Sequence, residues 1–325
     1  MPDIVTFGEA MIRLTPPGMQ RLEQAHAFDV WVTGAELNVA VGLARLGASA
    51  GWVSRLPVNA LGRRVASHAR ANGVDTAGVE WTEKGRLGLF FVEVGEAPRP
   101  SATLYDRGDS AFAALDPAAF DWGRLLAGAR AFHASGITPA LSAACEQATE
   151  DALRAAHAAG CHTSYDLNFR GRLTTPADAR RCLKRLAPAV DTLVASMGEV
   201  EAVLGLAGSP GDVAGQLRDA LGIDRVVVST RIGGRDGMQL RHSALADGEV
   251  LESESPAFRT VDPLGAGDAF SAGFLLGMLE EGPRRGLEMA GAVAAFKQSI
   301  PGDFAILVRE EVDHLLDGGD GRTQR

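Results

Sequence analysis

Short apolar runs rich in β-branched residues alternate along the chain with longer segments of helical periodicity. This alternation predicts a mostly parallel β-sheet with helices on both faces. Glycine or proline marks the helix ends, since Gly47 follows the first helix and Pro176 opens the third. The predicted strands are residues 4–7, 50–53, 131–134, 163–167, 192–195 and 226–229, and the predicted helices are residues 35–46, 146–158 and 175–186.

Two segments, residues 10–33 and 87–107, interrupt this alternation. In the second, Leu87, Leu89 and Phe91 recur with a two-residue period, which is typical of exposed antiparallel strands with one buried face. We therefore expect a small β-sheet lid inserted into a core built from residues 1–9, 34–86 and 108–316. The polar tail, residues 317–325, is expected to be frayed.

The charge balance narrows the class of protein. The 325 residues carry 32 Lys and Arg against 41 Asp and Glu, a net charge of −9, which argues against nucleic-acid and anionic-membrane partners. No apolar stretch approaches the roughly 18 to 20 residues of a bilayer span, and the N-terminus lacks a secretory pattern. The chain has three cysteines, an odd number that favours a reducing compartment. Together these features predict a cytoplasmic protein.

Two common nucleotide-binding motifs are missing from the sequence. Its three lysines are Lys84, Lys184 and Lys297, and because none follows a glycine there is no G-x-x-x-x-G-K-[ST] phosphate loop. Gly265 and Gly267 begin the spacing of a dinucleotide fingerprint, but Phe270 stands where the third glycine belongs. Any nucleotide must therefore be held in another way.

The strongest chemical signal is the segment 261–273, which reads VDPLGAGDAFSAG. Pro263 disfavours a helix before it, the glycines allow a tight turn, and residues 269–278 are apolar nearly all round, as in a buried helix. The turn then stands at a helix N-terminus, where free N–H groups and the helix dipole attract anions. Asp268 lies beside this anion site, where its carboxylate either caps the helix or takes part in chemistry.

This segment resembles the C-terminal motif D-T-x-G-A-G-D-x-F-x-x-G of the ribokinase-like, or PfkB-type, carbohydrate kinases. The resemblance extends over residues 4 to 316 and implies a three-layer α/β/α core with a lid. It also implies that Asp268 is the general base and that the Gly265, Ala266 and Gly267 amides stabilise the transferred phosphoryl group. Pro263 replaces the motif's Thr and removes a hydroxyl near any monovalent-cation site. The matching positions are Asp262, Gly265, Ala266, Gly267, Asp268, Phe270 and Gly273.

Three further segments are similar to motifs of this family. Residues 33–38 resemble G-G-A-x-x-N, which implies sugar contacts. The alternative is that they only form the N-terminus of a helix. Residues 196–199 resemble N-x-x-E, so Glu199 either orders Mg²⁺ through water or only favours a helix start. Residues 226–234 resemble a strand and nucleotide loop, or are a plain surface turn. The implied sugar contacts are Gly34, Ala35 and Asn38, and the implied ATP contacts are Ser196, Ser229, Arg231, Gly233, Gly234, Gly265 and Gly267.

Two segments resemble the 2-keto-3-deoxygluconate kinases. Residues 105–111 are similar to Y-Y-R-x-x-S-A, and residues 166–170 to D-x-N-x-R. Arg107 and Arg170 are thereby expected to grip a sugar carboxylate with their guanidinium forks, the alternative being solvated surface charge. Tyr105 is also expected at the sugar, and Asp303 is expected to accept a sugar hydroxyl or to cap a turn. Asp106 replaces the second Tyr and should weaken the local positive charge.

These resemblances imply a kinase that uses ATP and Mg²⁺ to phosphorylate the 6-hydroxyl of 2-keto-3-deoxy-D-gluconate. Its partners would be small molecules and a second copy paired through the lid. Two alternatives stay open: a kinase of the same fold acting on fructose, ribose or another sugar or sugar acid, and a sugar-binding regulator without turnover. Retention of Asp268 beside an intact anion site speaks against the regulator, because binding alone needs no base.

Overall fold

A nine-stranded sheet in the order β13-β12-β11-β10-β9-β8-β1-β4-β5 forms the centre of the molecule. The computed structural model describes residues 2–234 and 237–319. All pairs from β5 to β11 are parallel, and β12 and β13 add an antiparallel edge. The strands are β1 (Ile4–Phe7), β4 (Ala50–Pro57), β5 (Val79–Thr82), β8 (Ala131–Ser135), β9 (His162–Asp166), β10 (Thr192–Ser196), β11 (Arg225–Gly234), β12 (Gly237–Ala246) and β13 (Glu249–Glu254).

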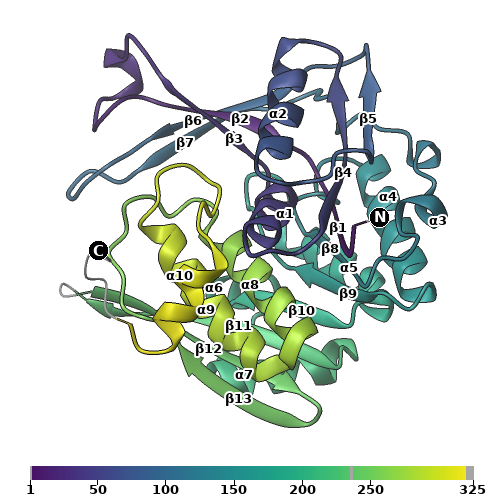
Figure 1. The fold of residues 1–325 in the computed structure, drawn as a ribbon, viewed down its shortest axis with the longest axis vertical. Helices are drawn as coiled ribbons and strands as arrows, with labels where there is room; N and C mark the ends of the chain where they lie inside the picture. The colour runs from purple at the N-terminus through teal and green to yellow at the C-terminus, as the bar shows by residue number, and fades with distance from the viewer. Residues whose placement is uncertain (1, 235–236, 320–325) are drawn as a thin grey trace.

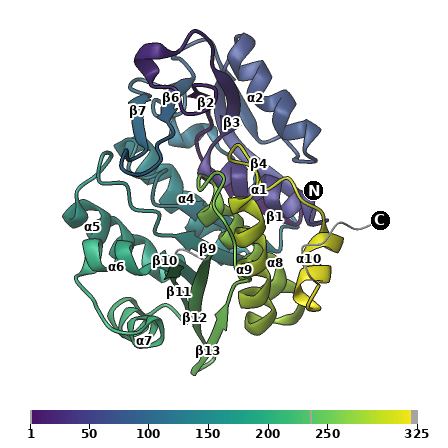
Figure 2. The same ribbon diagram turned by 90° about the vertical axis from the view of Figure 1, so that its left-hand side faces the viewer.

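Helices cover both faces of this sheet and complete three layers (Figures 1 and 2). One apolar core joins the sheet to α3–α7, and a second joins it to α1, α2 and α8–α10. The predicted three-layer core with a mostly parallel sheet is therefore confirmed. The helices are α1 (Ala35–Arg45), α2 (Ala60–Ala71), α3 (Trp122–Leu125), α4 (Ala143–Ala158), α5 (Pro176–Leu186), α6 (Met197–Leu204), α7 (Pro210–Leu221), α8 (Ala266–Glu281), α9 (Pro283–Gln298) and α10 (Arg309–Leu316).

A separate four-stranded sheet, in the order β3-β2-β6-β7, projects from one end of the core (Figure 1). Its strands lie within residues 10–33 and 87–107, and we call it the lid. Within each segment the pairing is antiparallel as expected, β2 with β3 and β6 with β7, whereas β2 and β6, which join the two segments, run parallel. The lid strands are β2 (Met11–Thr15), β3 (Asp29–Thr33), β6 (Gly88–Glu93) and β7 (Ala102–Asp106).

The buried face of β6 also differs from the predicted one. Phe90 and Val92 are buried, whereas Leu89 and Phe91 are half-buried on the opposite face. Leu87 is buried because it precedes the strand, not because it shares a buried face with Leu89. Both faces of β6 carry apolar side chains, so a two-residue period could not identify the inner one.

The structure bears on two further expectations. Within the described ranges, no helix combines the length and apolar character that crossing a bilayer takes. The tail predicted to be frayed, residues 317–325, lies outside the described residues from 320 onward.

Candidate active site

A cleft opens at the carboxyl ends of β9, β10 and β11, opposite the N-terminus of α8. It contains about 1160 Å³ of empty space that is open to solvent. Ligands of open parallel sheets bind at this edge of the strands. The polar residues that line the cleft include Asp166, Asn168, Arg170, Ser196, Glu199, Ser229, Arg231, Gly265, Gly267 and Asp268.

The turn before α8 presents free amides to this cleft. Gly265 has φ 81°, in the left-handed region, and a Cβ there would lie 2.0 Å from the Asp303 carbonyl oxygen. Only glycine fits both constraints. The Ala266 amide donates to the Pro263 carbonyl oxygen at 3.3 Å. In the described chain the Gly265 and Gly267 amides donate to no protein acceptor, so these two are available to bind an anion, and we call them the candidate anion site.

Asp268 is the third residue of α8, and its side chain does not cap the helix. It is 8% exposed, and its Oδ2 accepts a hydrogen bond from Asn38 Nδ2 at 2.6 Å. Its Oδ1 has a single long contact, 3.5 Å from Asn168 Nδ2. Burial raises the pKa of Asp268 to about 6, against the lowering effects of Asn38 and of the Arg170 charge. This carboxylate is therefore positioned and unusually basic, as a general base should be.

Two further carboxylates lie near Asp268. Asp166 is buried and accepts from Ser271 Oγ at 3.1 Å, and its pKa is raised by burial and then by the Glu199 and Asp268 charges. Glu199 accepts from the Ser196 amide and hydroxyl, both at 2.8 Å, in a capping box at the start of α6. Within residues 2–234 and 237–319, no three acidic, His or Cys side chains form a metal cage.

The two candidate arginines differ in their surroundings. Arg170 is exposed at the cleft, and no carboxylate in the described chain pairs with its guanidinium. Arg107 pairs through Nη2 with the buried Glu9 carboxylate, while its own buried Nε has no protein partner. Ser110 donates to the other Glu9 oxygen. Sequence reasoning missed Glu9, which meets Arg107 only through the fold.

Tyr105 and Asp106 lie on opposite faces of β7. Tyr105 stacks on Phe90 with ring centroids 5.5 Å apart. Asp106 pairs through both oxygens with Arg86, at 2.6 Å each, and this pairing lowers the pKa of Asp106. Asp106 therefore neutralises the positive charge of Arg86, and not that of Arg107, whose partner is Glu9.

The predicted Gly34-Ala35-Asn38 segment forms the start of α1 beside the lid. A Cβ on Gly34 would lie 2.3 Å from the Glu9 carbonyl oxygen, so glycine lets the two segments meet. Glu36, which sequence reasoning missed, is buried and accepts three hydrogen bonds from Ser135 and Thr138. Burial raises the pKa of Glu36 to about 7. This network anchors the helix that carries Asn38.

Asp303 is 4% exposed, and both of its oxygens are engaged. Thr33 Oγ1 donates to one at 2.7 Å and Arg13 Nη1 to the other at 2.8 Å. The geometry favours a role in holding the anion-site turn over direct contact with a sugar. Arg13 and Thr33 are on lid strands, so the same carboxylate also ties the lid to the core.

The expected nucleotide loop is the end of a long strand. Ser229 and Arg231 line the cleft, but Gly233 and Gly234 continue β11 and pair with Met238 and Gly237 of β12. The prediction of a loop at these two glycines was wrong, because β11 remains paired with β12 past the point where its pairing with β10 ends.

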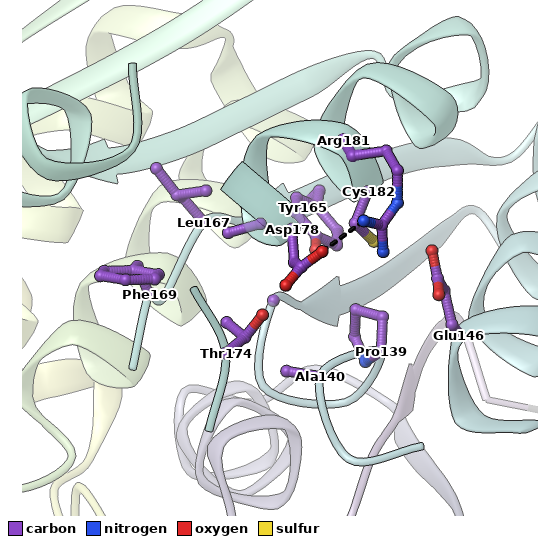
Figure 3. A pocket seen from close by; sticks show the side chains of 12 residues that line it. Pro139, Ala140, Glu146, Tyr165, Leu167, Phe169, Thr174, Asp178, Arg181 and Cys182 are labelled. Atoms are coloured by element: carbon purple, nitrogen blue, oxygen red, sulfur yellow. Dashed lines mark hydrogen bonds and ion pairs between the residues drawn. The ribbon is translucent and has the colours of Figure 1, made fainter. Parts of the chain in front are cut away.

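A second pocket lies behind the segment that follows β9 (Figure 3). Leu167 and Phe169 line it, alternating along the chain with Asn168, which lines the main cleft. Asp178 and Arg181 form an ion pair at its rim. Its empty space is about 410 Å³, so the main cleft offers far more room for a nucleotide and a sugar together.

Comparisons with known proteins agree with this geometry. A sequence model described as pfkB family carbohydrate kinase matches residues 1–302. A 2-dehydro-3-deoxygalactonokinase of Haloferax volcanii is 41% identical, covering 99% of this chain and 99% of that protein. A 2-dehydro-3-deoxygluconokinase of Thermoproteus tenax is 29% identical, covering 97% and 94%.

A solved structure shows the same likeness in three dimensions. The crystal structure of 2-dehydro-3-deoxygluconokinase from Thermotoga maritima matches with a TM-score of 0.91 and 35% identity, covering 97% of this chain and 98% of that one. The nine-stranded core, the four-stranded lid and the G-A-G-D turn at the start of α8 thus agree with a family match over residues 1–302. The chain belongs to the pfkB family of carbohydrate kinases.

Proposed function

We propose that the protein transfers the γ-phosphoryl group of ATP to the terminal 6-hydroxyl of 2-keto-3-deoxy-D-gluconate. The observation that carries this proposal is the buried Asp268 carboxylate beside the free Gly265 and Gly267 amides, with Arg170 on the same cleft. Transfer to an acidic sugar needs a base, an anion site and a guanidinium. The 2-dehydro-3-deoxy acid kinases similar to this chain support the same class of acceptor.

Asp268 accepts the proton of the sugar hydroxyl while the hydroxyl oxygen bonds to the γ-phosphorus. The bond from that phosphorus to the bridging oxygen breaks, and ADP leaves with the electron pair. Oδ1 receives the proton, because Oδ2 is held by Asn38. With a pKa of about 6, the carboxylate is ionised at neutral pH and yet more basic than an ordinary Asp. The Gly265 and Gly267 amides stabilise charge on the phosphoryl oxygens.

Asp166 and Glu199 would hold a hydrated Mg²⁺ against the phosphates. The fit rests on the crowding of negative charge that raises the pKa of Asp166, since a cation would offset it. Mg²⁺ usually keeps several waters and takes one or two carboxylates plus phosphates. When bound, it neutralises phosphate charge. Ser196, Ser229 and Arg231 are the proposed ATP contacts on the same wall.

Arg170 and Arg107 would read the sugar carboxylate. Arg170 has its whole fork available, whereas Arg107 offers the part that Glu9 leaves free. Gly34, Ala35 and Tyr105 would flank the sugar. The lid would then close over the sugar, so that water does not compete for the phosphoryl group.

The lid also has an outer face on which we propose that two copies pair. Val30, Leu14, Phe91 and Leu104 stand in one register row across its four strands. The end residues of this row are well exposed, Val30 at 41% and Leu104 at 58%. Exposed apolar rows of this kind mark interaction surfaces.

The experiment is an ADP-release assay with Mg²⁺ and ATP against 2-keto-3-deoxygluconate, its galacto epimer, gluconate, fructose and ribose. We expect 2-keto-3-deoxygluconate to be preferred. The galacto epimer is the second candidate, favoured by the 41% identity with the Haloferax volcanii enzyme. Preference for fructose or ribose would refute the proposal that the arginines bind a sugar carboxylate. No ADP release with any of the five compounds would favour a regulator without turnover.

A further inference from the structure

Lys297 is a lysine buried without any exposed surface, in the last turn of α9. Its Nζ donates to the backbone carbonyl oxygens of Asp262, at 3.0 Å, and Ile300, at 2.9 Å. Removing an ammonium from water is costly, so a lysine is almost never fully buried unless it is paired. The position of Lys297 therefore needs an explanation beyond packing.

The charges of Asp262, Asp303, Arg13 and Asp268 act on this ammonium. Arg13 Nη1 lies 2.8 Å from an Asp262 oxygen and 2.8 Å from an Asp303 oxygen. Burial lowers the pKa of Lys297, and the Asp262 and Asp303 charges oppose that lowering. Two buried cations, Lys297 and Arg13, thus face the three buried carboxylates of Asp262, Asp303 and Asp268, which favours the protonated form of the lysine.

This charged cluster holds the turn that carries the anion site. The Asp262 carboxylate accepts from the Leu264 amide at 3.1 Å and from the Gly302 amide at 3.1 Å. The backbone of Asp303 is in contact with Gly265. Lys297 holds the Asp262 carbonyl at the start of the same turn, three residues before Gly265.

The ligand set around Nζ is one that suits a hard cation. Backbone carbonyl oxygens with carboxylates nearby are the oxygen donors that such metal ions take. Here the ammonium stands between the two carbonyl oxygens, and Pro263 offers no hydroxyl. The residues therefore do not fit a separate monovalent metal ion at this place.

We propose that Lys297 is a built-in cation that positions the anion-site turn, so that phosphoryl transfer needs no added monovalent metal ion. The inference rests on the proposed kinase reaction. Lys297 touches neither phosphate nor sugar and is a positioning residue. Its removal lets the turn shift away from the geometry that stabilises the transferred group, so kcat falls while KM for the sugar acid changes little.

The test compares monovalent cations at constant ionic strength. The wild type should give the same kcat in tetramethylammonium, Na⁺, K⁺ and NH₄⁺ chlorides. Lys297→Ala, which leaves room for a small cation, should lose on the order of 10- to 100-fold in kcat in tetramethylammonium and recover part of it in K⁺ or NH₄⁺. Lys297→Met, which fills the space, should not recover. Lys184→Met, the same change at an exposed lysine, is the matched control.

A second readout does not depend on activity. The unfolding temperature of Lys297→Ala should rise in K⁺ or NH₄⁺ relative to tetramethylammonium, because an ion that binds only the folded state stabilises it. The wild type should show no such difference.

Activation of the wild type several-fold by K⁺ would overturn the proposal, and this measurement needs no variant. Full turnover of Lys297→Ala without added cation would also overturn it. If no acid is phosphorylated at all, the kinase proposal fails, and the unfolding temperatures still decide the role of Lys297.

Discussion

The core wall of the cleft and the lid are built differently. On the core wall, Asp268 is buried, hydrogen-bonded to Asn38 and set on a helix that packs on all sides. On the lid, Tyr105 is 38% exposed and lies on the last strand of a small sheet. In the proposed function, the buried core wall supplies the groups for the chemistry and the lid supplies groups that select the substrate.

Charge is also handled differently on the two sides. The core wall concentrates carboxylates whose pKa values are raised by burial, namely Asp166 and Asp268. Around the lid, Arg107 is balanced by Glu9, and Arg86 by Asp106. Changes to the buried carboxylates of the core wall should therefore act on turnover, and changes to the arginines and the lid on recognition and assembly.

The largest effect is expected at Asp268. Asp268→Asn keeps the shape and loses the base, so kcat should fall by on the order of 10² or more, with KM for the sugar acid within a few-fold. Steady-state ADP release measures both. Asp219→Asn, at an exposed carboxylate on α7, should leave both constants unchanged. Unaltered turnover of Asp268→Asn would show that Asp268 is not the general base.

The arginines should act on binding. Arg170→Ala and Arg107→Ala should each raise KM for the acid by roughly 10- to 100-fold, the scale of a lost charged hydrogen bond, with a smaller change in kcat. Arg107→Ala also leaves Glu9 buried and unpaired, so it should lower the unfolding temperature as well. Adding Glu9→Gln should restore the unfolding temperature but not KM. Wild-type kinetics in both arginine variants would refute the carboxylate argument.

The raised pKa of Asp268 has a consequence for stability. The folded state keeps its proton up to a pKa of about 6, against 3.8 ordinarily, so this group's contribution to stability is lost as pH rises through that interval. Asp268→Asn should therefore unfold with a free energy higher by roughly 1 to 3 kcal/mol at pH 8, and the gain should vanish near pH 4. Urea titrations at both pH values measure it. A gain of equal size at both would contradict the raised pKa.

The smallest effect on turnover is expected on the outer face of the lid. Leu104→Lys places a charge in the exposed apolar row, so the pair of copies should separate while kcat changes less than about two-fold. Light scattering gives the mass in solution. Glu249→Lys, on the opposite edge of the molecule at β13, is the control. A wild-type protein that light scattering shows to be a monomer would refute the pairing proposal.

The sequence predicted the core better than the lid. Buried parallel strands read as continuous apolar runs, and glycine and proline marked the helix ends, so α1 and α5 were found almost to the residue. The edge strands β5, β12 and β13 were missed, because their polar residues interrupt the continuous apolar runs by which the buried strands were identified. In the lid, apolar residues occupy both faces of β6, so periodicity could not choose the inner face.

The site divides in the same way. Asp268, Gly265 and Gly267 belong to one continuous motif, so they can be identified directly from the sequence. Asn38 meets Asp268 across 230 positions, and Glu9, Glu36 and Arg13 gain their roles only from such distant contacts. Lys297 entered the sequence analysis as one of three lysines outside a phosphate loop and as the start of a matching segment, but without a role, because nothing local marks a lysine as buried.

The most direct test of the central claim compares two acceptors that differ at one group. These are 2-keto-3-deoxy-D-gluconate and 3-deoxy-D-fructose, in which a hydroxymethyl group replaces the carboxylate. A site that pairs the acid with guanidinium groups should prefer it in kcat/KM by on the order of 10² or more. That preference should collapse in Arg170→Ala. Equal kcat/KM for the two acceptors in the wild type would contradict the account.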